Sequence, residues 1–189
     1  MKKDIILCGV GGQGILSIAT IIGQAATEAG LYLKQAEVHG MSQRGGDVQS
    51  NLRLSTEPIF SDLIPKGKVD MIVSMEPMEA LRYLPYLAAD GVVVTNSKNF
   101  VNIPDYPDAA AVEQELKALP KSVLLDIEDL AKQTKNPKGA NMVLLGKVAA
   151  HLEILSADQL RNAVSRIFQR NGAEVVESNL KAFDLGLNA

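Results

Sequence analysis

The sequence predicts an α/β fold in which a mostly parallel, doubly wound sheet carries one antiparallel strand and is followed by a helical C-terminal third. Two observations lead to this prediction. Short apolar runs alternate with helical periodicity over residues 1–135, which is typical of strand–helix–strand units. Residues 136–189 show helical periodicity alone. We therefore expect a single domain over 1–189, with the sheet in its first part and packed helices in its second.

A strand–helix–strand unit opens the chain. Residues 4–8 form a short apolar run ahead of a glycine, as in a buried parallel strand. Apolar residues then recur at helical spacing from Ile15 to Ala29, and Gly30 ends the helix. A second strand is expected at 31–38, joined to the first by a right-handed crossover.

An antiparallel strand is predicted at Asp47–Ser55. Its apolar residues alternate with polar ones, which is typical of an antiparallel strand near a sheet edge. The connection before it, His39–Gly46, has only eight residues. A parallel crossover needs about a dozen residues or more. The short connection therefore predicts that this strand runs against its neighbour.

Prolines, glycines and apolar periodicity mark the remaining elements. We expect strands at 69–75, 91–96 and 122–127, and helices at 77–87, 109–119, 128–134, 142–152, 157–170 and 175–186. Ser156 and Gln159 form a capping box ahead of the second C-terminal helix. Gly146 lies in the middle of a helix, where glycine costs about 1 kcal/mol relative to alanine. We therefore expect another backbone to pack closely against it.

Composition argues against several classes of function. The net charge of −3 and the aromatic content of 4% disfavour a protein that binds nucleic acid or an anionic membrane. A single cysteine, Cys8, allows no internal disulfide and no iron–sulfur cluster held by this chain alone, and we expect it to be a buried structural thiol. Two histidines make a zinc site improbable. No apolar run is long enough to span a membrane, so we expect a cytoplasmic protein.

The clearest motif is a glycine loop directly after the first strand. Gly9-x-Gly11-x-x-Gly14 matches the fingerprint of a Rossmann-like dinucleotide site, and Glu37 ends the next strand, where a ribose partner would lie. Glycines let the backbone approach a phosphate, and the start of the helix offers free N–H groups and a partial positive charge. The other interpretation is a tight strand-to-helix turn without a ligand. Both interpretations remain open from the residues alone.

A second loop, His39–Gly46, is rich in hydrogen-bond donors. Ligands of open α/β sheets bind outside the carboxyl ends of the strands, so we expect both loops at the same rim. Arg44 could then help the glycine loop to hold an anion. The alternative is a solvated surface connection. No catalytic triad, paired-carboxylate site or metal cluster emerges from the sequence.

Taken together, the two loops resemble the gamma-type subunit of 2-oxoacid:ferredoxin oxidoreductases, in particular the branch that acts on indolepyruvate. The specific signal is the second loop, read with Glu37 and Val38 before it. The resemblance covers essentially the whole chain, with supporting stretches at 79–84, 91–96, 141–146 and 179–183.

The resemblance implies a subunit without a catalytic centre of its own, inactive alone. The complex converts a 2-oxoacid, CoA and oxidised ferredoxin to an acyl-CoA, carbon dioxide and reduced ferredoxin. Thiamine diphosphate and the iron–sulfur clusters are implied in a larger partner subunit, through which ferredoxin is reduced. Independently of the resemblance, the surface left uncovered on the isolated chain predicts self-association as a homodimer. The loops would contact CoA, another anion or only the partner subunit, through Gly11, Gly12, Gln13, Gly14, Gln43 and Arg44. The alternative is an independent oxidoreductase that binds NAD(P) or FAD at the glycine loop.

Overall fold

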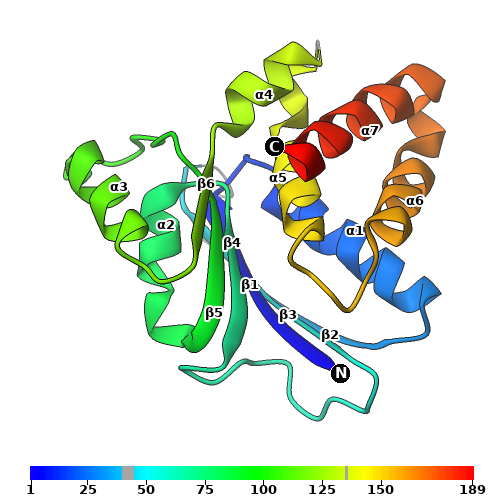
Figure 1. Cartoon of the computed structure of the whole chain (residues 1–189), viewed down its shortest axis with the longest axis horizontal. Coiled ribbons are helices and arrows are strands. Elements are labelled where there is room, and N and C mark those ends of the chain that lie inside the picture. The colour runs from blue at the N-terminus through cyan, green and yellow to red at the C-terminus, as the bar shows by residue number, and fades with distance from the viewer. Residues whose placement is uncertain (40–44, 135) are drawn as a thin grey trace.

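The computed structural model describes residues 1–39, 45–134 and 136–189 of the chain. Over these residues the fold is built on a six-stranded sheet with the order β2-β3-β1-β4-β5-β6 (Figure 1). The strands are β1 (Lys2–Val10), β2 (Tyr32–His39), β3 (Asp47–Ser55), β4 (Val69–Ser74), β5 (Leu87–Asn96) and β6 (Ser122–Leu125). Strands β1, β4, β5 and β6 run parallel, as predicted.

Helices cover both faces of the sheet (Figure 1). One face carries α2 (Pro77–Arg82) and α3 (Ala109–Lys117), and the other carries α1 (Ile15–Glu28), α5 (Ala140–Ala149), α6 (Ala157–Phe168) and α7 (Ala173–Asn188), with α4 (Ile127–Gln133) against α5 and α7. Alternate residues of β1 supply the two cores: Ile5 and Leu7 pack with α1 and the C-terminal helices, and Ile6 and Cys8 pack with α2 and α3. The expected doubly wound arrangement is therefore confirmed.

Strand β3 is antiparallel to both of its neighbours, β1 and β2, which confirms the prediction for residues 47–55. It lies between them, however. The strand–helix–strand unit predicted from residues 4–38 therefore joins two parallel strands that are not hydrogen-bonded neighbours. The β2–β3 connection is short enough for β3 to pair beside β2, so β3 occupies the place next to β1 that a parallel β2 would otherwise take.

The polar face of β3 is buried rather than solvated. Arg53 is 9% exposed, and its guanidinium makes a two-pronged ion pair with the fully buried Asp4 of β1, at 2.9 Å and 3.0 Å. The carbonyl oxygens of Ser61 and Leu63 accept the remaining Arg53 hydrogen bonds. The loop over residues 56–68 thus covers a strand face that the alternation predicts to be polar.

One helix boundary was predicted wrongly. The helix expected at 77–87 ends at Arg82 and is followed by the 3₁₀ turn η1 (Leu84–Tyr86), and β5 begins at Leu87 rather than at 91. Pro85 explains the difference, because its ring lacks an N–H group and disfavours helical backbone at the preceding residue.

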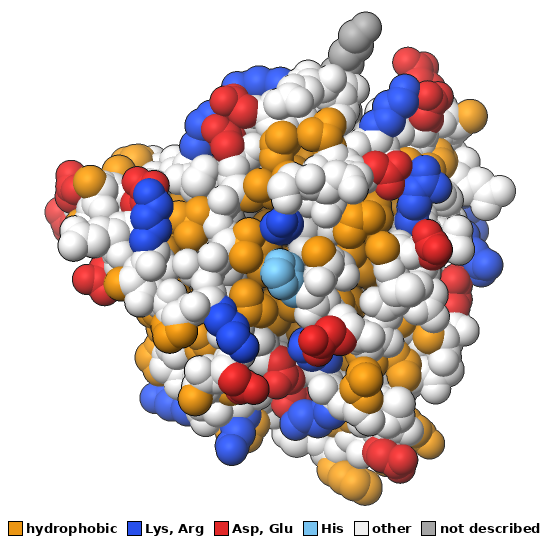
Figure 2. Space-filling model, viewed as in Figure 1, with side chains coloured by type: hydrophobic (Ala, Val, Ile, Leu, Met, Phe, Trp, Pro, Cys, Tyr) orange, Lys and Arg blue, Asp and Glu red, His pale blue; other side chains and the backbone are white. Residues whose placement is uncertain are grey.

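The C-terminal helices follow the predicted pattern. The capping box at the start of α6 is present: the Ser156 hydroxyl accepts the Gln159 N–H, and the Ser156 N–H donates to the Gln159 side chain. Short 3₁₀ turns, η2 (Pro137–Gly139) and η3 (Gln169–Asn171), precede α5 and α7. None of the described helices is long and apolar enough to cross a lipid bilayer. On the face shown in Figure 2, described side chains of both charges are interspersed, so this face presents no extended basic patch.

Candidate functional site

The two predicted loops meet at the rim formed by the carboxyl ends of the parallel strands. The Gly11 N–H donates to the Gly46 carbonyl oxygen at 2.8 Å, and the Gly45 N–H donates to the Gly11 carbonyl oxygen at 3.2 Å. The expectation of a shared rim is therefore confirmed for the end of the second loop. Gln43 and Arg44 lie outside the described residues.

The glycine loop makes a tight turn between β1 and α1. The Gln13 N–H donates to the Val10 carbonyl oxygen at 3.1 Å, which closes the turn. Gly12 and Gly14 have φ angles of 101° and 83°, in the left-handed region that favours glycine. Gly14 is also the residue that caps α1, and its carbonyl oxygen accepts from the Asn141 amide at 3.3 Å. Gly12 and the fingerprint glycine Gly14 thus serve the turn whatever else they bind.

Gln13 fills the gap between the ends of β1 and β4. Its side-chain oxygen accepts the Val10 N–H at 2.8 Å, and its amide nitrogen lies 3.5 Å from the Met75 carbonyl oxygen just after β4. These two strands mark the point where the chain order reverses, since α1 and α2 leave toward opposite faces. Ligands of such sheets often bind there. Here both groups of the Gln13 amide are engaged by protein, so this residue positions the loop.

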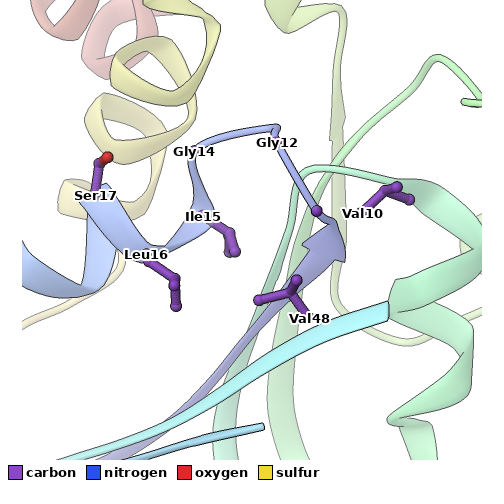
Figure 3. Close-up of a pocket in the computed structure, with 8 residues that line it drawn as sticks. Val10, Gly12, Gly14, Ile15, Leu16, Ser17 and Val48 are labelled. Carbon is purple, nitrogen blue, oxygen red and sulfur yellow. The ribbon is translucent and has the colours of Figure 1, made fainter. Parts of the chain in front are cut away.

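A cavity of about 360 Å³ opens beside the glycine loop (Figure 3). Its lining residues come from the end of β1, the glycine loop, the first turn of α1 and the start of β3: Val10, Gly11, Gly12, Gly14, Ile15, Leu16, Ser17 and Val48. The side chains of Ile15, Leu16 and Val48 form an apolar wall in the space between α1 and β3 (Figure 3). None of the lining residues, all in the described part of the chain, has a titratable side chain.

The start of α1 brings free backbone donors to this cavity. The N–H groups of Ile15 and Leu16, in the first helical turn, find no acceptor among the described residues, whereas those of Gly11 and Gln13 are already used. Free donors at a helix N-terminus carry a partial positive charge that favours phosphate or carboxylate oxygens. Free N–H groups and an apolar wall therefore lie beside one another at this cavity.

The acidic residue of the dinucleotide fingerprint is not beside the glycine loop. Glu37 lies on the edge strand β2, exposed, where it accepts a hydrogen bond from Gln35. Because β3 lies between β2 and β1, Glu37 is two strand spacings, roughly 10 Å, from β1. The expectation of a ribose partner at Glu37 was therefore wrong, and an NAD(P) or FAD site of the predicted kind is not formed.

A polar cluster that the sequence did not predict lies under the rim. Asp47, the first residue of β3, accepts the Tyr83 hydroxyl at 3.1 Å from each carboxylate oxygen. Close by, the buried Glu79 makes an ion pair with Arg82 at 2.9 Å. Burial, with the charge of Asp47 adding to it, raises the pKa of Glu79 above the ordinary glutamate range despite Arg82. The cluster ties the end of the second loop to α2.

The thiol of Cys8 lies against the same cluster and is fully buried. Its sulfur donates to the Glu79 carbonyl oxygen at 3.6 Å, and burial raises the pKa of the thiol well above its usual range. Cys8 is therefore a structural thiol, as expected. No local sequence signal predicts that Glu79 and Asp47 lie close together, because the two residues are far apart in the chain.

The chain matches a known protein family over almost its whole length. The family model described as pyruvate ferredoxin/flavodoxin oxidoreductase matches residues 4–189. Indolepyruvate oxidoreductase subunit IorB of Pyrococcus horikoshii is 37% identical, over 100% of this chain and 96% of its own length.

Solved structures share the fold. Pyruvate oxidoreductase subunit PORC of Thermotoga maritima has a TM-score of 0.75 at 21% identity, covering 99% of this chain and 96% of its own. A 2-oxoglutarate:ferredoxin oxidoreductase of Magnetococcus marinus, solved with coenzyme A bound, has a TM-score of 0.75 at 22% identity. The match covers 99% of this chain but only 30% of that longer chain.

Proposed function

This chain belongs to the pyruvate ferredoxin/flavodoxin oxidoreductase family, and from that premise we propose that it is the smaller, non-catalytic subunit of an indolepyruvate:ferredoxin oxidoreductase. The observation that carries the proposal is the 37% identity to an indolepyruvate oxidoreductase subunit over essentially the whole of both chains. The complex would convert indolepyruvate, CoA and oxidised ferredoxin to the aryl-acetyl-CoA, carbon dioxide and reduced ferredoxin.

The chemistry of this reaction requires groups that this chain does not hold. Thiamine diphosphate supplies the electron sink for decarboxylation, and iron–sulfur clusters carry the electrons to ferredoxin. A cluster needs several thiolates, whereas the single cysteine, Cys8, is buried in the core between the sheet and α2. Both cofactors therefore belong to a larger partner subunit in this proposal.

The rim at the glycine loop is the part of this chain that we assign to the partner subunit and to CoA. The cavity beside Ile15 and Leu16 pairs free N–H groups with an apolar wall, and a CoA phosphate matches the donors. The residues assigned to this site are Gly11, Gly12, Gln13, Gly14, Gln43 and Arg44. Within that set, Gly11 and Gln13 act by shaping the loop, because their N–H groups are bonded to the protein.

Reconstitution tests the assignment. The chain and its proposed larger partner subunit would be purified separately and together, and reduction of ferredoxin or a viologen dye would be followed with each 2-oxoacid. We expect this chain to be inactive alone and the complex to have its highest kcat/KM with indolepyruvate. Full CoA-dependent activity of the larger subunit alone would overturn the proposed role. A preference of the complex for pyruvate or 2-oxoglutarate would overturn the substrate assignment only.

A further inference from the structure

An exposed apolar loop lies between β5 and α3. The side chains of Phe100, Val101 and Ile103 are 49%, 71% and 40% exposed. Single apolar side chains on a surface are ordinary, but three large ones within four residues make a contiguous patch of the kind that marks an interaction site.

A buried carboxylate holds this loop in shape. Glu76 is fully buried at the start of α2, where its side chain accepts the Glu79 N–H at 2.9 Å. The other carboxylate oxygen accepts the Phe100 N–H at 3.2 Å and the Tyr106 hydroxyl. A buried carboxylate is costly unless it is fully hydrogen-bonded, so these donors fix both ends of the loop.

The base of the loop is fixed as well. The Asn96 side chain, at the end of β5, accepts the Lys98 N–H at 3.2 Å and donates to the Lys98 carbonyl oxygen at 3.1 Å. A loop whose backbone is already ordered loses little conformational entropy when it binds. The apolar side chains are thus presented on a preformed support.

The loop is continuous with the glycine rim. The Asn102 amide donates to the Gly45 carbonyl oxygen at 2.9 Å, and the Gly45 N–H donates in turn to Gly11. One hydrogen-bonded chain therefore links the apolar loop, the second loop and the glycine loop.

We propose that residues 100–103 are a docking element for the larger catalytic subunit, contacting an apolar surface of that subunit next to the glycine rim. This inference rests on the proposed function. The occupant follows from continuity with the rim assigned to that subunit, and from the apolar character expected at the centre of a stable subunit interface. Asn102 links the docking element to Gly45 at the end of the second loop.

A pair of matched variants tests this. The double variant Phe100→Ser/Val101→Ser removes the patch. The control, Phe60→Ser, removes a side chain that is 95% exposed in the 56–68 loop, at the opposite end of the sheet. Binding of each purified chain to the purified larger subunit would be measured by calorimetry, with thermal unfolding recorded for every variant. We expect at least tenfold weaker binding for the double variant and unchanged binding for Phe60→Ser.

The possible outcomes distinguish a failure of the docking inference from a failure of the proposed function. If the wild-type chain does not bind the larger subunit, the proposed function fails. If wild type, Phe60→Ser and the double variant all bind with equal affinity, the docking inference fails and the proposed function stands. If the double variant instead loses only self-association of the isolated chain, the patch belongs to a second copy and the inference is overturned. Val101→Ser alone serves where the double variant does not fold.

Discussion

Gly146 of α5 lies directly against the carbonyl oxygen of Phe183 in α7, and a Cβ atom at position 146 would meet that oxygen at 2.0 Å. The contact is reciprocal, because a Cβ at Gly186 would lie 1.8 Å from the Val143 carbonyl oxygen. The two helices therefore touch backbone to backbone, which confirms the expectation for Gly146. This crossing packs the last helix of the chain onto the layer that also contains α1.

Replacing Gly146 should therefore destabilise the protein. Gly146→Ala is expected to lower the free energy of unfolding by about 1–3 kcal/mol, because overpacking outweighs the gain in helix propensity. Gly23 is the matched control: it also lies inside a helix, but its Cβ would make an ordinary contact, 3.4 Å from the Leu33 side chain. Gly23→Ala should raise stability by roughly 0.5–1 kcal/mol. Urea denaturation measures both, and a stabilised Gly146→Ala would contradict the close crossing.

The buried Asp4–Arg53 pair should matter far more than a surface pair. Asp4→Ala leaves the Arg53 guanidinium buried without its carboxylate, so we expect a loss of about 3–5 kcal/mol. Asp184 pairs with Arg161 in a similar two-pronged geometry, but both side chains are about 40% exposed. Asp184→Ala should cost less than about 1 kcal/mol. Equal losses for the two variants would show that burial of the pair is not what stabilises it.

Blocking the cavity should impair CoA use by the complex. Ser17 is exposed and lines the mouth of the cavity in the first turn of α1, so the bulk of a tryptophan at this position should obstruct it without disturbing the core. We expect the KM for CoA to rise at least tenfold while the KM for the 2-oxoacid stays within about twofold. Thr20→Trp, one turn further along the same helix and outside the cavity, should change neither constant. An unchanged KM for CoA in Ser17→Trp would remove CoA from this cavity.

Arg44 provides a separate test of the anion assignment. If its guanidinium pairs with a CoA phosphate, Arg44→Ala should weaken CoA binding by about tenfold, measured by calorimetry on the complex. Arg170→Ala, near the start of α7, serves as a control for the loss of one positive charge. Equal CoA affinity for wild type and Arg44→Ala would take Arg44 out of the site.

Stability should depend on the protonation of Glu79. Because burial raises its pKa in the folded state, the folded protein binds the proton more tightly than the unfolded chain. The free energy of unfolding should therefore fall as pH rises from the ordinary glutamate range through the raised pKa, and Glu79→Gln should remove this part of the pH dependence. Urea denaturation at a series of pH values measures the difference between the two curves.

Glu177 supplies the opposite case for comparison. It is exposed, and its hydrogen bond with Lys181 lowers its pKa, so Glu177→Gln should not remove the loss of stability on raising pH. If the curves of wild type and Glu79→Gln are parallel between pH 4 and pH 8, the pKa of Glu79 is not raised.

Elements whose signals are local could be predicted from the residues alone. The Ser156 capping box, the end of α1 at Gly30 and the antiparallel run of Asp47–Ser55 all depend on residues within a few positions of one another. Local spacing also predicted that the two loops share one rim, because the carboxyl ends of parallel strands meet at one edge of the sheet. The family resemblance came from the same short motifs.

Which strands and side chains become neighbours depends on how the whole chain packs. Strand β3 lies between β1 and β2, and Glu37 on β2 is therefore far from the glycine loop. The Gln13 side-chain amide is hydrogen-bonded to backbone groups at the ends of β1 and β4. Likewise Asp47 faces Tyr83, and Glu76 reaches Phe100, across long stretches of chain. Strand order and buried polar partners depend on contacts between distant residues, and neither hydrophobic periodicity nor motif spacing contains that information.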